Sequence, residues 1–313
     1  MDYFCDLKIE KGIVELSGDV TKNYISIDNV DYFIGYLDPN FPKNKGANSF
    51  VLALYDAQSY DETATPVKAI KISKIANEYH KEIVRKNPYN RSFYTEIDVL
   101  KDCSERELLN VLRIDTSGHL IIKEMKKAFP FYLMDYAEYD LKKFFEIHEL
   151  DMSGKLNLCI DIAKGLKELY DLGYYHRDLK PDNIFMFGDV WKIGDLGLVA
   201  RRDSENNDNS YKIIGPKGWL SPESMNRYLT QEKDRRYDCK IDHQSDVFQL
   251  GKIFWFIIQG NVPIGCIKYT DYYGGDESIY ALIHYMLNHS KERRVKDISI
   301  VINELERIIK KNY

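Results

Sequence analysis

The 313-residue sequence predicts an α+β fold, with strands concentrated before about residue 137 and helices after it. Near the start, short runs such as 24–27 and 32–36 alternate apolar and polar side chains, with Asp and Asn between them, a pattern typical of β-hairpins. Between residues 156 and 172, leucine and isoleucine recur at helical spacing, and Gly173 follows as the helix end. The third observation is a polar loop, 176–183, which leads into a short hairpin that ends in an acid.

Composition places the chain among globular proteins, because 44% of its residues are hydrophobic and 30% are charged. Its length allows one large domain or two lobes. A net charge of −5 without a long basic block argues against nucleic acid as the main partner. The five cysteines are scattered and form no CxxC pair, so we expect neither a disulfide framework nor a zinc site.

Neither the opening residues nor the most apolar run suggests a secreted or membrane-spanning protein. The opening residues, MDYFCDLKIEK, lack the basic and apolar regions of a secretory signal. The most apolar run, 253–258, is too short to span a bilayer and is typical of a core helix. Together with cysteines that show no disulfide pattern, these features predict a cytoplasmic protein with no membrane contact.

The most informative stretch is HRDLKPDN at 176–183, followed by the acidic turn Asp195-Leu196-Gly197. Asp178, Lys180 and Asn183 offer a carboxylate, a cation and a carboxamide around one small volume. Such a set suits a phosphate-bound metal ion and a hydroxyl that must lose its proton.

These motifs resemble the catalytic loop and the metal-binding turn of the eukaryotic-type protein kinases. The resemblance covers about residues 31–313 and implies a bilobal fold, with a small antiparallel sheet and one main helix in the N-lobe and a larger, mostly helical C-lobe. It implies a nucleotide-binding N-lobe over 31–136 and, over 137–313, a C-lobe with the catalytic loop, the activation segment and the substrate-binding surface. Residues 1–30 remain as a β-rich extension, expected to cap the small lobe rather than to form a separate binding module.

Two segments before residue 75 resemble nucleotide-binding elements of that family. Residues 44–51, NKGANSFV, resemble its glycine-rich loop, with Gly46 as the middle glycine and Val51 in place, although Asn and Ser replace the outer glycines. Residues 67–72 alternate like a strand and resemble the strand that carries the phosphate-binding lysine. Lys71 is favoured over its neighbours because Ala69 shares its face and leaves room for adenine.

Two helical patterns follow, from 75 to 86 and from 92 to 101, with a break at Asn87-Pro88. The resemblance requires a helical glutamate that holds Lys71. The candidates are Glu78, Glu82 and Glu96. We choose Glu96, because residues 93–100 resemble the family's helix, and we expect the fourth strand to begin within 109–114. The resemblance then makes 73–90 an insertion.

Residues 131–137 resemble the fifth strand and the hinge between the lobes. Met134 would then be the gatekeeper, and backbone groups of Asp135 and Ala137 would bind adenine. Asp140 would lie near the ribose, at the start of a helix over 141–145.

The resemblance also implies the roles of the central residues. Asp178 would accept or orient the proton of the substrate hydroxyl, and Lys180 would balance charge on the γ-phosphate. Asn183 and Asp195 would hold Mg²⁺, with Mn²⁺ as an alternative, while Lys71 and Glu96 would fix ATP. His176 is expected to pack and hydrogen-bond rather than to titrate.

The activation segment would run from 195 to 223. Arg177 is the residue with which this family pairs a phosphate in that segment, so Ser204, Ser210 and Tyr211 are candidate regulatory sites. Autophosphorylation there, in trans within a homodimer, is part of this expectation. Two further expectations are that Asp246 braces the catalytic-loop backbone and that Arg294 pairs with Glu223.

The resemblance leaves the acceptor open. A lysine two positions after Asp178, here Lys180, resembles the pattern of serine/threonine kinases, whereas Pro216 and Trp219 depart from that pattern. Tyrosine or dual specificity therefore stays open beside the serine/threonine prediction. A nucleotide-binding scaffold without turnover and a small-molecule phosphotransferase of related fold are the two alternatives to an active kinase with a protein substrate.

Overall fold

The computed structural model describes residues 1–10, 13–38, 48–202, 214–230 and 236–312. The chain divides into two compact units: unit 1 comprises 1–107 and 113–137, and unit 2 comprises 108–112 and 138–313. Unit 1 is mainly sheet and unit 2 is mainly helical, so the predicted α+β class is confirmed. Across the described residues, no helix is long and apolar enough to cross a membrane.

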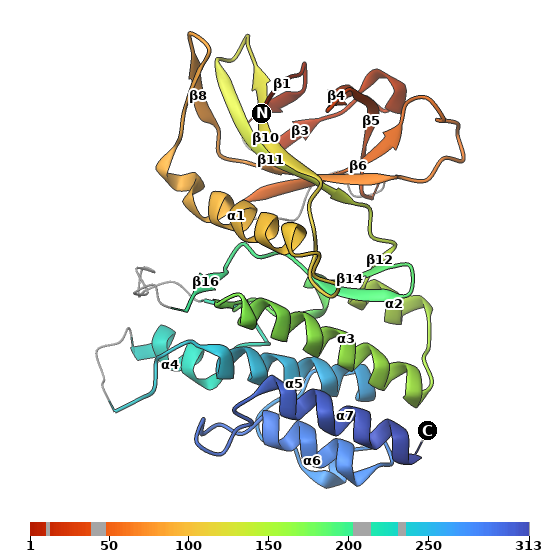
Figure 1. Ribbon diagram of the computed structural model, residues 1–313, viewed down its shortest axis with the longest axis vertical. Coiled ribbons are helices and arrows are strands. Elements are labelled where there is room, and N and C mark those ends of the chain that lie inside the picture. The colour runs from red at the N-terminus through yellow and green to blue at the C-terminus, as the bar shows by residue number, and fades with distance from the viewer. Residues whose placement is uncertain (11–12, 39–47, 203–213, 231–235, 313) are drawn as a thin grey trace. The chain divides into compact units, whose positions relative to one another are not determined.

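A nine-stranded sheet forms the frame of unit 1. Its strands are β1 (Asp2–Phe4), β4 (Tyr24–Ile27), β5 (Val30–Tyr36), β6 (Ser49–Asp56), β7 (Lys68–Ser73), β8 (Asn77–His80), β9 (Ile83–Arg85), β10 (Thr116–Ile122) and β11 (Lys127–Asp135). Their order is β1-β10-β11-β7-β6-β5-β4, with β8 paired to β11 and β9 paired to β8 (Figure 1). The pairing of β1 with β10 is parallel, so the sheet is not purely antiparallel as expected.

The first thirty residues are built into unit 1. β1 and β4 form the two ends of the main sheet path, and a small hairpin, β2 (Lys8–Glu10) and β3 (Ile13–Glu15), lies between them in sequence with the 3₁₀ turn Val20–Lys22. Leu7, Ile9 and Val14 are buried in the same core cluster as the main strands. The extension therefore shares the core of this unit.

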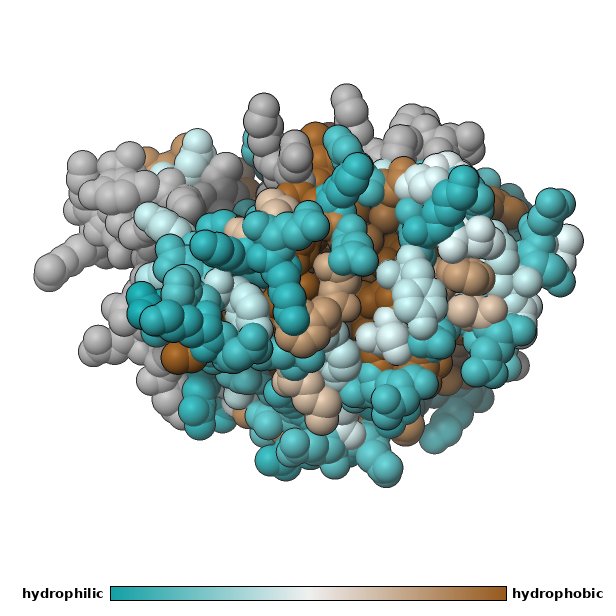
Figure 2. Space-filling model, turned by 90° about the horizontal axis from the view of Figure 1, so that it is seen from above, coloured by the Kyte–Doolittle hydropathy of each residue, from teal (hydrophilic) through white to brown (hydrophobic). Residues whose placement is uncertain are grey.

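The molecular surface that Figure 2 shows has hydrophobic residues near its middle and mostly hydrophilic residues toward its rim.

The predicted helix over 75–86 is wrong, because this segment forms the β8–β9 hairpin. Its two-residue turn, Lys81-Glu82, has positive φ angles of 49° and 60°. A turn of this kind matches the twist of a hairpin but is usually signalled by Asn-Gly. Pairing of β8 with β11 gives the segment a sheet edge to join, and this tertiary contact overrides the helical spacing of Ile75, Tyr79 and Ile83.

The predicted helix over 92–101 is confirmed as α1 (Arg91–Glu105), which follows the 3₁₀ turn Pro88–Asn90. It lies beside β11 (Figure 1) and buries Phe93, Ile97 and Leu100. The fourth strand does not begin within 109–114 but at Thr116. Residues 108–112 belong to unit 2 instead, where the Leu112 N–H donates to the Ile193 carbonyl at 2.8 Å.

Unit 2 consists of helices with short strands between them. The helices are α2 (Leu141–Ile147), α3 (Met152–Asp171), α4 (Pro222–Thr230), α5 (His243–Gln259), α6 (Glu277–Met286) and α7 (Ile298–Asn312), with 3₁₀ turns at Pro181–Asn183 and Tyr269–Asp271. The strands are β12 (Tyr139–Asp140), β13 (Tyr174–Tyr175), β14 (Ile184–Phe187), β15 (Val190–Ile193) and β16 (Ala200–Arg201). The helix predicted within 156–172 and the hairpin after the polar loop are both confirmed, as α3 and as β14–β15.

Helix α5 is the central element of unit 2, and α3 and α6 pack against it (Figure 1). It begins with a capping box between Asp242 and Ser245 and ends at Gly260, whose φ of 76° suits glycine. Most of its side chains are buried, including the predicted core run 253–258 apart from Phe256. Of the buried polar side chains on this largely apolar helix, Asp246 and Gln249 face the polar loop.

Candidate active site

In unit 1, β7 and α1 bring Lys71 and Glu96 into contact. Lys71 Nζ lies 2.7 Å from Glu96 Oε1, and the two side chains are only 8% and 2% exposed. The Tyr132 hydroxyl donates to the same carboxylate oxygen at 3.0 Å, and its ring stacks on Phe93. Because burying an ion pair costs desolvation free energy that such a contact only partly repays, this pair is weak evidence for stability and favours a functional interpretation.

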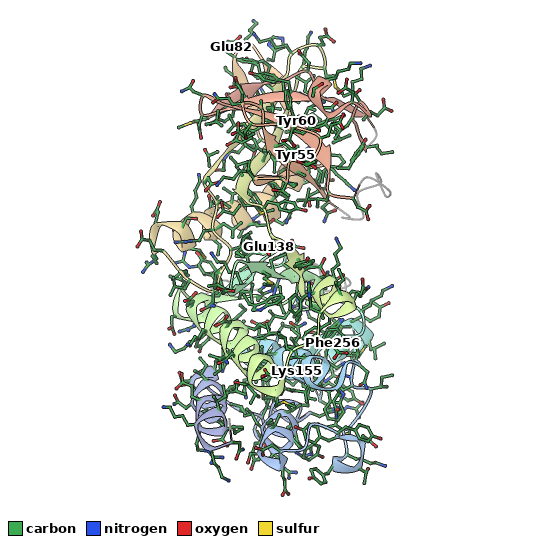
Figure 3. The ribbon with its side chains drawn as sticks, turned by 90° about the vertical axis from the view of Figure 1, so that its right-hand side faces the viewer. Tyr55, Tyr60, Glu82, Glu138, Lys155 and Phe256 are labelled. Carbon is green, nitrogen blue, oxygen red and sulfur yellow. The ribbon has the colours of Figure 1, made fainter. Side chains whose placement is uncertain are left out.

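The predicted pairing of Lys71 with Glu96 is therefore confirmed as a contact. Glu82 lies at the tip of the β8–β9 hairpin (Figure 3) and accepts a hydrogen bond from Tyr79. Glu78 is exposed on β8. The neighbouring Lys68 pairs instead with Asp115 and Asp135, each at 2.7 Å.

The other predicted nucleotide-binding residues of unit 1 occupy adjacent strands. Val51 is opposite Lys71 on β6 and β7, and Ala69 is opposite Met134 on β7 and β11. Asp135 is exposed and ends β11. The structure thus brings four of these residues onto neighbouring strands, while adenine binding by Met134, Asp135 and Ala137 stays a prediction. Gly46 lies outside the described residues.

In unit 2, the polar loop holds Asp178 and Asn183 against each other. The Asn183 amide donates to the Asp178 backbone carbonyl and to Asp178 Oδ2, both at 2.9 Å. Lys180 Nζ is 3.5 Å from the same carboxylate oxygen. Burial raises the pKa of Asp178, Lys180 opposes that shift, and the negative charge of Asp195 adds to it. The carboxylate therefore has a stronger tendency to take up a proton than an exposed aspartate.

His176 connects this loop to the acidic turn. Its Nδ1 accepts from the Asp178 N–H at 3.2 Å, so its Nε2 carries the hydrogen that reaches the Gly194 carbonyl at 3.1 Å. Burial lowers the pKa of His176 to about 4. The ring is therefore neutral at neutral pH and acts as a fixed hydrogen-bonding spacer, which is the role predicted for it.

Asp246 braces the loop from α5, as predicted. Its carboxylate accepts the N–H of His176 at 2.8 Å and that of Arg177 at 2.7 Å. Arg177 has a φ of 67°, a left-handed conformation that costs free energy in a non-glycine residue, and these hydrogen bonds offset that cost. Burial raises the pKa of Asp246 to about 7, because desolvation outweighs the two hydrogen bonds.

Gln249 is a site residue that the sequence analysis missed. One helical turn after Asp246, its amide oxygen accepts from the Leu179 N–H at 3.2 Å and its amide nitrogen donates to the Arg177 carbonyl at 3.3 Å. The available signal was a glutamine three positions after an aspartate on an otherwise apolar helix, which places both side chains on one face.

Asp195 follows β15 with a φ of 55°. The Gly194 N–H donates to the Asn183 carbonyl at 2.9 Å, which fixes this turn next to the polar loop. A carboxylate and an amide oxygen are ligands that Mg²⁺ prefers, and this cation is usually held by one or two carboxylates with phosphate oxygens and water. No group of three or more His, Cys, Asp or Glu side chains that could hold a metal occurs in the described part of the chain. Asp195 and Asn183 supply one ligand of each of these two types, so the chemistry of the two side chains is compatible with such a cation.

The far end of the predicted activation segment is anchored by a buried ion pair. Arg294 Nη1 lies 2.5 Å from Glu223 Oε1, and Nη2 lies 3.3 Å from Oε2, which confirms the predicted pairing. Arg177 Nε donates to the Leu198 carbonyl at 2.7 Å, near the start of the segment. The candidate phosphorylation sites Ser204, Ser210 and Tyr211 lie outside the described residues.

Comparison with known proteins matches residues 45–311 to the family model described as "Protein kinase domain". Similar proteins include a probable serine/threonine-protein kinase of Clostridium perfringens, 26% identical over 62% of this chain and 25% of its own length. The serine/threonine-protein kinase CLA4 of Candida albicans is 25% identical over 71% of this chain and 20% of its own length. An eIF2-alpha kinase of Caenorhabditis elegans, pek-1, is 33% identical over 31% of this chain and 10% of its own length. The chain thus spans a quarter or less of the length of these relatives.

Proposed function

Because the chain belongs to the protein kinase domain family, we propose that it transfers the γ-phosphate of ATP to a serine or threonine hydroxyl of a protein. The observation that carries the proposal is the buried ion pair of Lys71 and Glu96. Its desolvation cost has an explanation if Lys71 must be held where it contacts the phosphates of a nucleotide. The hydrogen-bonded cluster of Asp178 and Asn183 supports the same chemistry.

Each residue has a role that follows from its contacts. Asp178, whose pKa burial raises, accepts or orients the proton of the attacking hydroxyl, while Asn183 fixes its rotamer. Lys180 places a positive charge 3.5 Å from that carboxylate and balances charge on the transferred phosphoryl group. Asn183 and Asp195 would hold Mg²⁺ or Mn²⁺, which neutralises charge on the phosphate oxygens when bound.

The acceptor preference rests on Lys180 and on relatives whose names include "serine/threonine-protein kinase". Pro216 has neither a hydroxyl nor a backbone N–H, so it cannot make the polar contact that a threonine would make there. Tyrosine transfer is therefore the competing specificity. Protein substrates, and a homodimer that phosphorylates itself in trans, belong to the same proposal.

The test is incubation of the purified chain with labelled ATP, Mg²⁺ and a mixed peptide pool of Ser, Thr and Tyr acceptors, followed by mass spectrometry. We expect label on Ser or Thr, and loss of about three orders of magnitude or more in Asp195→Ala and in Asp178→Asn. Asp189→Ala is the matched control, because this exposed aspartate lies six residues before Asp195, in the β14–β15 turn. Full activity in Asp195→Ala would exclude the proposed chemistry, and label confined to Tyr would exclude the acceptor class.

A further inference from the structure

Tyr94 on α1 is the meeting point of a chain of hydrogen bonds that crosses unit 1. Asn77 of β8 donates to the Tyr94 hydroxyl oxygen at 2.6 Å. That hydroxyl lies 3.0 Å from His119 Nε2 on β10, and His119 Nδ1 lies 3.0 Å from Asp2 Oδ1 on β1. The four elements β1, β8, α1 and β10 are thereby linked through the Tyr94 side chain and His119.

The donors and acceptors along this chain are compatible at every step. An ionised Asp2 only accepts, so His119 Nδ1 carries the hydrogen and Nε2 accepts from the Tyr94 hydroxyl. The Tyr94 oxygen then accepts from Asn77, whose side chain is fully buried. Burial lowers the pKa of His119, in agreement with a neutral ring.

The start of α1 depends on the same segment. Asn90 precedes the helix but makes no side-chain cap hydrogen bond to it. Its amide instead donates to Asn77 Oδ1 at 3.0 Å and to the Ile75 carbonyl at 2.8 Å, and it accepts from Ser73 at 2.6 Å. The first turn of α1 is therefore fixed by the segment between β7 and the helix rather than by its own cap.

Tyr94 and Glu96 are two positions apart, and residues at this spacing do not face each other on a helix. Glu96 faces Lys71 in the core, whereas Tyr94 faces Asn77 and His119. The helix is thus held from two sides, by Lys71 in the core and by Asn77 and His119 on the other side.

We propose that Asp2, His119, Asn77 and Tyr94 are positioning residues that keep Glu96 on Lys71, so that the first strand of the chain is a built-in activating element. This inference rests on the proposed function, because it gives the purpose of holding Glu96 in place. The residues act through the ion pair and touch neither nucleotide nor substrate.

Backbone hydrogen bonds and a close approach at Gly118 fix the position of β1 beside β10. The His119 N–H donates to the Met1 carbonyl at 3.0 Å, and the Cys5 N–H donates to the Ile121 carbonyl at 3.1 Å. Gly118 allows this approach, because a Cβ atom at that position would overlap the Met1 carbonyl oxygen. Gly118→Ala is therefore expected to displace β1 without replacing any of the four hydrogen-bonded side chains.

The first experiment compares Tyr94→Phe with Tyr89→Phe, which makes the same chemical change at an exposed tyrosine just before α1. Hydrogen exchange of the α1 amides and the affinity for ATP are measured, with KM for ATP and for a peptide. We expect about a fivefold or larger rise in α1 exchange and in KM for ATP in Tyr94→Phe, with KM for the peptide unchanged, because a buried amide loses its acceptor. Unchanged α1 exchange and ATP affinity would overturn the proposal.

The second experiment asks whether the effect passes through the ion pair. In a Glu96→Gln background, Tyr94→Phe is expected to add little to the loss of ATP affinity, whereas independent sites would add fully. Full additivity would overturn the proposal. Gly118→Ala should reproduce the Tyr94→Phe phenotype, with Gly18→Ala as its control because a Cβ there meets nothing within 4 Å. Hydrogen exchange and ATP affinity need no phosphoryl transfer, so they test this inference even if no label is transferred.

Discussion

Replacement of Arg294 by methionine is expected to destabilise unit 2 by about 4 kcal/mol. The Arg294 side chain is completely buried, and it makes two contacts with the Glu223 carboxylate. Its guanidinium also donates to three backbone carbonyls, those of Gln244 at 2.7 Å, Asn288 at 2.8 Å and His289 at 3.1 Å. Methionine fills a similar volume but supplies no donor, so a buried carboxylate loses its main partner.

The size of this destabilisation follows from the buried Glu223 carboxylate that loses Arg294. Removing one partner of a buried pair costs about 3–5 kcal/mol, because the remaining charge is desolvated without compensation. The Ser245 hydroxyl at 3.1 Å and Lys291 at 3.9 Å still face Glu223, which favours the middle of that range. In the double variant Glu223→Gln with Arg294→Met, the buried charge is gone, and we expect about 2 kcal/mol of the loss to be recovered.

Urea unfolding followed by tryptophan fluorescence measures both values, because all three tryptophans, Trp191, Trp219 and Trp255, belong to unit 2. Two results would refute the reasoning: a loss below about 1 kcal/mol in Arg294→Met, or a double variant less stable than the single one.

Three further outcomes are expected. His176 has a pKa of about 4 when folded and an ordinary value near 6.5 when unfolded, so only the unfolded chain gains a proton as the pH falls from about 6.5. The free energy of unfolding should then drop by about 1.5 kcal/mol between about pH 6.5 and about pH 5 on account of this group, and urea titrations should show a shallower drop in His176→Gln. Glu96→Gln should raise KM for ATP about tenfold or more by weakening the hold on Lys71, and an unchanged KM would contradict the assigned role of the pair. Gly165→Ala should destabilise unit 2 by about 2 kcal/mol or more, because its Cβ would overlap the Asn110 carbonyl oxygen; a shift in thermal midpoint no larger than that of Gly18→Ala would contradict this.

The elements that could be predicted from sequence are those whose signals are local. The turn Asp28-Asn29, with φ angles of 52° and 63°, has the residue types that left-handed turns favour, and the strands around it were predicted. Helix α3 has regular spacing and an end at Gly173, with φ of 86°. The hairpin at 77–85 has no such signal, because Lys81 and Glu82 are unusual in its turn and β11 supplies the pairing from a distance.

The candidate site divides in the same way. Lys71, Glu96, Asp178 and Asn183 could be identified because the resemblance fixes their order, and their contacts agree with it. Gln249 could not, since its role depends on a loop seventy positions away. The Tyr94 contacts could not be predicted either, because they join a helix to β8 and β10, two strands that come together only through their pairing with β11 in the folded sheet.

The parallel pairing of β1 with β10 affects the order in which unit 1 can fold. Asp2 meets His119, a partner 117 positions later in the chain. During synthesis, β4 and β5 can pair as soon as they leave the ribosome, whereas β1 must wait until β10 has been made, and closing so long a loop is slow. The residues of β1 are thus paired later than those of β4 and β5, and until then the edge of β10 is open to other strands.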